Sequence, residues 1–235
     1  MSVDNKSLFG HTALGVKLKE ALLKSEVKIK KNYRKNYISH RLPDLPDINT
    51  IGEDGQDHIC LSISGKTDLG RALSPDITLT FDHKLLGQFV SIQAFWTWVR
   101  SEKRPDSVRF MSSKELHKFQ HNETNFIDYN LHNYKAIVMD ACWQMIQSMP
   151  EIKEEIIKSV QPFDMHYIDK NTKERKRPNY SIWYLYGMEE IRTTLKEDEN
   201  KRPAFKMMMN KDIKDLDAYI SEVFGITEPI KYEGP

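Results

Sequence analysis

The sequence predicts a mainly helical α+β fold, and three observations lead to this prediction. Apolar residues recur at helical spacing in several long segments, whereas only short stretches alternate between apolar and polar residues. Hydrophobic residues make up 39% and charged residues 29% of the 235 residues, as in a globular protein with a well-solvated surface. A chain of this length can bury one large core. We therefore expect a single compact core domain, residues 57–196, with few short strands, between an N-terminal segment, residues 1–56, and a C-terminal helix and tail, residues 197–235.

The N-terminal segment is predicted to form an amphipathic helix followed by an irregular loop. Apolar residues repeat at helical spacing from about Thr12, and the basic run KIKKNYRKNY (residues 28–37) gives the helix a cationic end. This run is either a solvated helix end or a surface that contacts the phosphates and bases of nucleic acid. Prolines and glycines make residues 41–57 a loop, because proline removes backbone donors and glycine adds backbone freedom.

The first half of the core is predicted to contain two strands and an aromatic helix. Alternating apolar and polar residues favour strands at residues 58–64 and 77–81. Ser91 then offers an N-cap for a helix in which Phe95, Trp96 and Val99 repeat at helical intervals.

Helices dominate the second half. Residues 134–145 repeat apolar side chains at helical spacing, and Pro150 suits the first turn of a following helix, where its missing N–H costs nothing. We expect this pair to form a helical hairpin. The remaining predicted elements are a short strand at residues 163–168, a charged turn at residues 169–177, a helix at residues 182–195 and a last helix at residues 213–224 that ends at Gly225.

Composition excludes some classes of function. With 35 Lys plus Arg against 34 Asp plus Glu, no global field steers the protein toward nucleic acid or membrane. No apolar run approaches the roughly 18 residues that span a bilayer, so we expect a cytoplasmic protein without a membrane partner. Cys60 and Cys142 stand in apolar surroundings without CxxC spacing, and we expect both to be reduced core residues.

One phrase combines groups that bind phosphate. GKTDLGRALS (residues 65–74) holds two glycines, hydroxyl groups, Lys66 and Arg71, which together suit backbone and cationic contacts with a phosphate. The phrase lacks the GxxxxGK[ST] order of a Walker loop, and its glycines equally fit a strand-to-helix turn. A ligand-binding turn and a structural turn are both open on this composition.

A second phrase gives this turn a context. GQFVSIQAFWTW (residues 87–98) follows it, and the pairing of GKTxLGRxLS with GxFxSIxxFWxW resembles the NADAR (YbiA-like) family of N-glycosidases. A looser similarity in the order of segments extends the resemblance over residues 57–195. It implies a YbiA-like domain that binds ADP-ribose-like or ribose-phosphate ligands and hydrolyses an N-glycosidic bond. Members of the family act on riboflavin-pathway intermediates or remove ADP-ribose from guanine in nucleic acid.

The resemblance also raises the question of which acid is catalytic. Breaking the C1'–N bond of a riboside passes through an oxocarbenium-like centre, which a carboxylate stabilises. The glutamate of the family's helix start falls at Gln93, and Pro75 stands where many relatives have asparagine. Gln93 can orient a water or hold a ribose hydroxyl but carries no charge. Asp68, Asp76 and Asp164 are the nearest acids by sequence context that can replace the missing carboxylate.

The ligand-binding residues follow from the same resemblance. We expect phosphate contacts from Lys66 and Arg71, hydrogen bonds or turn capping from Thr67 and Ser74 around Gly70, ring stacking from Trp96, and an approach from the later strand by His166 and Tyr167. Trp96 and His166 can instead be core residues, and Trp98 is expected in the core.

No metal site and no cofactor are expected. The eight histidines are scattered, and none forms an HExxH pattern or a tight cluster with carboxylates. His117 and His121 are four residues apart, but without a third ligand nearby they are expected to be a solvated surface pair.

Three functions are consistent with the sequence. The first is an N-glycosidase that hydrolyses an N-ribosidic bond of an ADP-ribosyl or related nucleotide substrate, such as ADP-ribosylated guanine in DNA or RNA, with water as the nucleophile. The second is a module that binds ADP-ribose or a nucleotide without turnover, because Gln93 is neutral. The third is a nucleic-acid-binding protein that uses residues 28–37.

Overall fold

The computed structural model describes residues 45, 47–122, 133–209 and 213–230. The chain divides into two units, Met1–Arg41 and Leu42–Pro235, and every described residue lies in the second. The predicted N-terminal helix and the basic run at residues 28–37 lie outside the described residues. The nucleic-acid interpretation of that run therefore stays a prediction.

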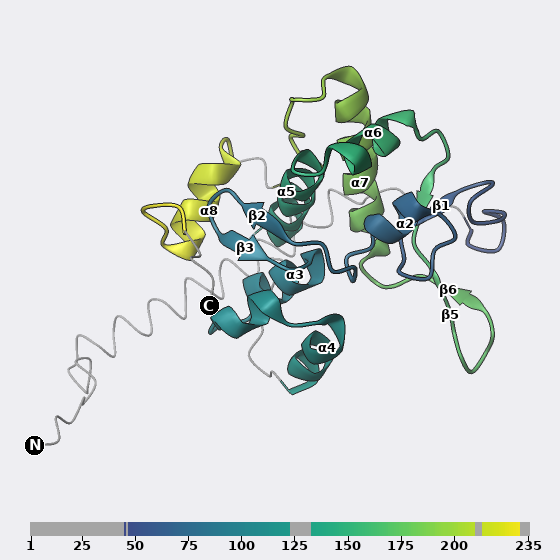
Figure 1. The fold of residues 1–235 in the computed structure, drawn as a ribbon, viewed down its shortest axis with the longest axis horizontal. Helices are drawn as coiled ribbons and strands as arrows, with labels where there is room; N and C mark the ends of the chain where they lie inside the picture. Colours follow the sequence, from purple (N-terminus) through teal and green to yellow (C-terminus); the bar gives the residue numbers. More distant parts are fainter. Residues whose placement is uncertain (1–44, 46, 123–132, 210–212, 231–235) are drawn as a thin grey trace, which may run out of the picture. The chain divides into compact units, whose positions relative to one another are not determined.

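The described chain is an α+β fold in which helices predominate, as the sequence predicts (Figure 1). The described part of the loop predicted at residues 41–57 contains turns at residues 48–50 and 55–57 and no helix, as expected. The elements in order are β1 (Ile59–Cys60), α2 (Asp68–Ala72), β2 (Phe81–His83), β3 (Gly87–Phe89), α3 (Ile92–Arg100), a short 3-10 helix (Asp106–Phe110), α4 (Ser113–Asn122), α5 (Tyr134–Gln147), α6 (Pro150–Lys158), β4 (Phe163–Asp164), β5 (Tyr167–Ile168), β6 (Arg175–Lys176), α7 (Ser181–Glu197) and α8 (Leu216–Phe224).

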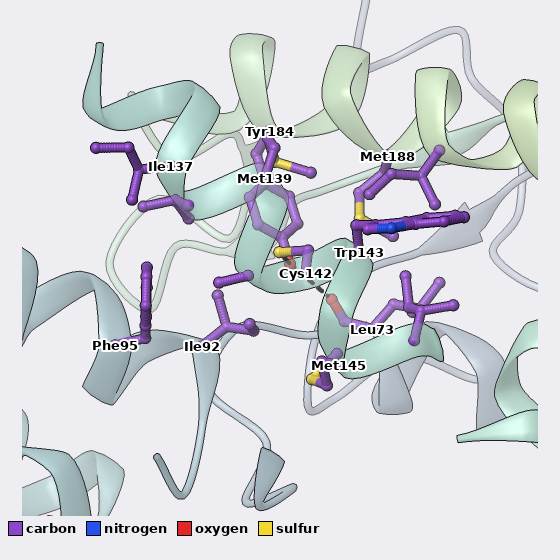
Figure 2. Packing of buried hydrophobic residues seen from close by; sticks show 14 of the residues in the cluster. Leu73, Ile92, Phe95, Ile137, Met139, Cys142, Trp143, Met145, Tyr184 and Met188 are labelled. Carbon is purple, nitrogen blue, oxygen red and sulfur yellow. Dashed lines mark hydrogen bonds between the residues drawn. The ribbon is translucent and has the colours of Figure 1, made fainter. Parts of the chain in front are cut away.

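Helix α5 lies at the centre of the hydrophobic core. Its residues 136–143 are buried without interruption, so the helix is covered on all sides rather than along one stripe. Helices α3, α6 and α7 and strand β2 pack against it. Figure 2 shows Cys142 of α5 in the same buried cluster as Phe95 from α3 and Tyr184 from α7. The aromatic helix predicted at residues 91–99 is thus a core element.

Local signals set the ends of the helices as predicted. The Ser91 hydroxyl accepts the N–H of Ala94 at 3.0 Å and caps α3. Pro150 is the first residue of α6, and Gly225 ends α8 in the left-handed conformation with φ of 64°. The helical hairpin of α5 and α6 is confirmed, because the two helices are consecutive and in contact.

The strands are shorter than the sequence predicts, and they form two-stranded sheets. Strand β1 pairs in parallel with β4, with Ile59 opposite Phe163 and Cys60 opposite Asp164. Strands β2 and β3 pair antiparallel, as do β5 and β6. The strand predicted at residues 58–64 ends at Cys60, because the Cys60 carbonyl accepts the N–H of Ser62 and turns the chain toward α2. The strand predicted at residues 77–81 forms instead at Phe81–His83.

The structure also bears on the predictions for the two cysteines and for the membrane. Cys60 and Cys142 are both buried free thiols, and burial raises the pKa of Cys142 to about 12, as fits a core residue. None of the described helices is long and apolar enough to cross a membrane.

Candidate functional site

The side chain of Arg71 holds the turn that leads into α2. Its Nη1 donates to the carbonyls of Gly65 and Lys66 at 2.8 and 3.0 Å, and its Nη2 forms an ion pair with Asp68. The ammonium group of Lys66 is exposed and lies 3.4 Å from the Glu53 carboxylate. The geometry therefore supports a structural role for Arg71, and its predicted contact with phosphate stays a prediction.

Thr67 and Gly70 are placed by the same turn. The Thr67 hydroxyl caps α2 and accepts the N–H of Gly70 at 2.9 Å. A Cβ added at Gly70 would lie 2.4 Å from the carbonyl oxygen of Cys60, so only glycine lets α2 approach strand β1 this closely. Asp54 completes the turn, because its carboxylate accepts the backbone N–H groups of Cys60 and Lys66 at 2.9 and 2.6 Å.

A second group of predicted residues gathers where the chain leaves α2 and meets α3. The carbonyl of Pro75 accepts the N–H of Gln93 at 2.8 Å, which ties the loop that carries Asp76 to the first turn of α3. The buried Ser74 hydroxyl lies 3.4 Å from the N–H of Asp76 and accepts from it. Of the three candidate acids, Asp76 is therefore the one whose neighbour in the chain, Pro75, is hydrogen-bonded to Gln93.

The three candidate acids differ in their surroundings. The Asp68 side chain is 99% exposed and paired with Arg71. The Asp164 carboxylate is buried and paired with Arg177 and His166. The Asp76 carboxyl group is partly buried and has no hydrogen-bond partner among the residues that the structure describes. Burial raises the pKa of Asp76, against a smaller opposing effect of a histidine on α4. A carboxyl group of this kind is typical of a functional site.

Two buried polar atoms near Asp76 lack partners as well. Gln93 is 8% exposed, and neither its Oε1 nor the Trp96 Nε1 has a hydrogen-bond partner in the described part of the chain. The Trp96 ring meets the rings of Tyr180 and Trp183 edge to face, with centroids 4.8 and 5.0 Å apart. Buried polar groups nearly always have hydrogen-bond partners. We therefore expect a ligand or an ordered water to bind these two atoms.

Two residues at this site were not predicted from the sequence. Burial and the nearby Asp76 carboxylate raise the pKa of Tyr180, which precedes α7. His117 on α4 lies within electrostatic reach of the same carboxylate. Both come from elements distant in the sequence, and no local pattern marks either as a site residue. We call the group formed by Ser74, Asp76, Gln93, Trp96, His117 and Tyr180 the Asp76 site.

His166 and Asp164 belong to a different cluster. The Nδ1 of His166 lies 2.7 Å from Oδ2 of Asp164, and the Nε and Nη2 of Arg177 bind Oδ1 at 2.9 and 2.7 Å. The hydrogen bond to Asp164 raises the pKa of His166 to about 9. The Cys60 Sγ lies 3.7 Å from the same Nδ1. A nucleophile–histidine–acid triad uses the two opposite ring nitrogens, so these three residues do not form one.

The parallel pairing of β1 with β4 brings His58 to this cluster. His58 is 1% exposed, and its ring lies 5.3 Å from that of His166. One ligand atom each from His58, Asp164 and His166 lies within 4.8 Å of the others, which makes this a group that could hold a metal ion. Sequence spacing did not show it, because the two histidines are brought together by strand pairing. Tyr167, also predicted at the ligand site, is 47% exposed on β5.

A surface cavity of about 440 Å³ lies apart from both the Asp76 site and the cluster of His58, Asp164 and His166. It is lined by Asp82, Lys84, Trp143, Gln144, Gln147, Ser148 and Arg202. Its cationic groups are already paired, Lys84 with Asp217 and Arg202 with both Asp140 and Asp217. None of the candidate site residues lines this cavity.

The structure thus separates the predicted residues into three places. Lys66, Thr67, Asp68, Gly70 and Arg71 form the turn into α2, whereas Ser74, Asp76, Gln93 and Trp96 lie at the Asp76 site, and Asp164 and His166 lie at the cluster beside β4. Comparisons with protein-family models, with curated proteins and with solved structures found no match to this chain, so the resemblance to the NADAR family and the YbiA-like form of the fold remain predictions.

Proposed function

We propose that the protein is an N-glycosidase that hydrolyses the N-ribosidic bond of an ADP-ribosyl or related nucleotide, and that Asp76 is its catalytic carboxylate. The observation that carries the proposal is the Asp76 carboxyl group, partly buried and unpaired among the described residues, beside the buried amide of Gln93. Gln93 stands where the resembling family has its glutamate. The neighbouring Asp76 supplies the charge that Gln93 lacks.

The proposed reaction needs three things from this site. Ionised Asp76 takes a proton from a water as the water oxygen bonds to C1', and its charge stabilises the oxocarbenium-like transition state. The C1'–N bond breaks, its electron pair stays with the departing base nitrogen, and this nitrogen takes a proton from solvent water, to which Asp76 later returns its own. Gln93 holds the attacking water or a ribose hydroxyl through its unpaired Oε1. The Trp96 ring, in T-shaped contact with Tyr180, is the ring on which we expect the base to stack.

The acid at position 76 can be tested against a matched acid at position 68. Purified full-length protein is incubated with ADP-ribosylated guanine DNA, with nicotinamide dinucleotides and with riboflavin intermediates, and released base or ADP-ribose is measured. We expect Asp76→Asn to lower the rate by about 10²- to 10⁴-fold. Asp68→Asn changes an exposed carboxylate and should leave the rate unchanged. Equal rates for wild type and Asp76→Asn would refute the assignment of Asp76.

The alternative function is a module that binds the same ligands without turnover. It is favoured by one specific observation, the neutral amide of Gln93 at the start of α3. Under this alternative, ADP-ribose raises the melting temperature of the wild-type protein, yet no product is released from any of the three substrates.

Gln93→Glu distinguishes the two functions. If the site is an enzyme that uses Asp76, a second carboxylate beside it should couple with the first, split the two pKa values and displace the acidic limb of the pH–rate profile. If the site is an inactive relative, the substitution should create product release where the wild type shows none. No effect of Gln93→Glu on either rate or pH profile would remove Gln93 from the site.

Two further expectations belong to this proposal. A substrate of ADP-ribosylated guanine in DNA or RNA makes nucleic acid a partner, and the basic run at residues 28–37 would supply the contact with phosphates. We also propose the cytoplasm as the place where the enzyme acts. Neutralising Lys30, Lys31 and Arg34 should flatten the salt dependence of DNA binding without changing hydrolysis of a mononucleotide substrate.

A further inference from the structure

We infer that His58, Asp164 and His166 form a binding site for a divalent transition-metal ion of the zinc type, which joins strand β1 to strand β4. Their ligand atoms lie within 4.8 Å of one another on adjoining parallel strands. The inference is independent of the proposed hydrolysis at Asp76, because none of these three residues belongs to the Asp76 site.

His58 is the observation that points to a ligand. It is 1% exposed, and neither of its ring nitrogens has a hydrogen-bond partner in the described residues. The Ile51 carbonyl lies near the ring but outside hydrogen-bond geometry. A buried imidazole without partners is costly, since its polar atoms have left water without replacement.

Arg177 prepares Asp164 for the same role. Two nitrogens of its guanidinium bind Oδ1 of Asp164, which fixes the carboxylate plane and leaves Oδ2 facing His166. A basic or polar group that orients a ligating carboxylate in this way is the usual outer-shell arrangement of a metal site. Arg177 comes from the chain just after β6, so the hairpin of β5 and β6 carries the orienting group.

The donor set selects the class of metal. Two imidazoles and one carboxylate suit zinc and related transition metals, whereas calcium and magnesium require mostly oxygen ligands. The Cys60 thiol, 3.7 Å from His166, is a further soft donor. Metal–ligand distances of about 2.1 Å place tetrahedral ligands about 3.4 Å apart, so the three side chains must close slightly around the ion. The proton that His166 shares with Asp164 must leave when the metal binds.

The site can be tested with the metal alone. Full-length protein is stripped with a chelator, dialysed, and titrated with zinc by calorimetry and with cobalt by visible absorption. We expect one equivalent to bind, a rise in melting temperature with either metal, and a cobalt spectrum of low coordination number. His58→Gln and His166→Gln should weaken binding more than 100-fold, whereas Arg177→Met should weaken it by about 10- to 100-fold as an outer-shell change.

His121→Gln is the matched control, because His121 is an exposed histidine at the end of α4. It should bind metal as the wild type does. Circular dichroism shows whether each variant folds. If a ligand variant does not fold, the cobalt spectrum of the wild type still tests whether the protein binds a metal ion. A wild type that binds no stoichiometric zinc or cobalt would overturn the inference. So would equal loss of binding in His121→Gln, which would place the metal elsewhere.

Discussion

The carboxyl group of Asp76 has opposite effects on stability and on the proposed function. Burial raises its pKa above 3.8, so folding favours the protonated form. Its contribution to stability is therefore fully present below the unfolded pKa and is lost as the pH rises through the raised folded pKa. The proposed catalysis needs the ionised form, which is the less stable one in this environment.

Asp76→Asn should consequently make the protein more stable at neutral pH while it removes activity. Asparagine has the shape of the protonated acid but never ionises, so the desolvation of a charge is avoided. We expect a higher melting temperature than wild type at pH 7, and the same melting temperature at about pH 3, where the wild-type carboxyl is protonated. A lower melting temperature of Asp76→Asn at pH 7 would mean that the carboxylate has a stabilising ionic partner.

Gly70 has a steric role, and a substitution at Gly187 provides a comparison for it. A Cβ at Gly70 would meet the Cys60 carbonyl at 2.4 Å, and backbone cannot move aside without shifting β1. A Cβ at Gly187 in α7 would have side-chain atoms of Met139 as its nearest contacts, the closest at 2.5 Å, and methionine adapts to a changed space. Both substitutions gain helix propensity of about 0.5–1 kcal/mol.

We therefore expect Gly70→Ala to lower the free energy of unfolding by about 1–3 kcal/mol and Gly187→Ala to lower it less. Urea denaturation of both variants measures the difference. Equal losses, or a larger loss for Gly187→Ala, would show that β1 yields as readily as a methionine side chain.

At the scale of elements, most of the longer helices could be predicted from the sequence, although α4 was not, and the strands could be predicted only in part. Strand β1 lies within the strand predicted at residues 58–64, and β4 and β5 lie within the one predicted at residues 163–168. Helices α3, α5, α6 and α7 lie where apolar periodicity, a Ser91 cap or Pro150 predicts them, because each signal acts within one or two turns. The strands have only two or three residues each, and their partners decide where they form. Helix α2 was expected as a turn, since five residues are too few to show a period.

The cap at Ser91 is the element-scale feature that links fold to site. Its hydroxyl satisfies the N–H of Ala94, and the same first turn of α3 places Gln93 against the Pro75 carbonyl. Ser91→Ala should lower the free energy of unfolding by about 1 kcal/mol and also reduce ligand binding at the Asp76 site. Ser91→Thr keeps the accepting oxygen and should restore most of both. Thermal melts and ADP-ribose titration measure the two effects; a stability loss with unchanged binding would uncouple the cap from the site.

At the scale of the molecule, both proposed sites depend on contacts between distant segments. His58 meets Asp164 and His166 only because β1 pairs with β4, and Asp76 meets Tyr180 only because α7 follows α5 across the core. The sequence could name Ser74, Gln93 and Trp96 of the Asp76 site through two local phrases, and Asp76 through its place just after the first phrase. It could not show that Arg71 and Thr67 serve their own turn, since that depends on which carbonyls lie within reach after folding.

The segment after the predicted core boundary at residue 196 also contributes to the core. Phe205 is completely buried, and its N–H binds Glu190 of α7. Asp140 of α5 is completely buried, and Arg202 binds it at 2.6 Å. Burial alone would raise the pKa of Asp140, but hydrogen bonds from His83 and Arg202 outweigh it and lower the pKa. Asp140 is therefore ionised in the folded protein and depends on Arg202 for its charge balance.

Removing Arg202 should be costly because it leaves a buried carboxylate without its cation. We expect Arg202→Met to lower the free energy of unfolding by about 3–5 kcal/mol, as for other broken buried pairs. Adding Asp140→Asn to the same chain removes the stranded charge and should recover much of this loss. Lys201→Met is the neighbouring control, since among the described residues the Lys201 ammonium forms a single ion pair, an exposed one with Glu197 at 3.6 Å, and it should have no measurable effect. Urea denaturation of the three variants decides the matter: if Arg202→Met and Lys201→Met behave alike, residues beyond 196 do not stabilise the core through Asp140.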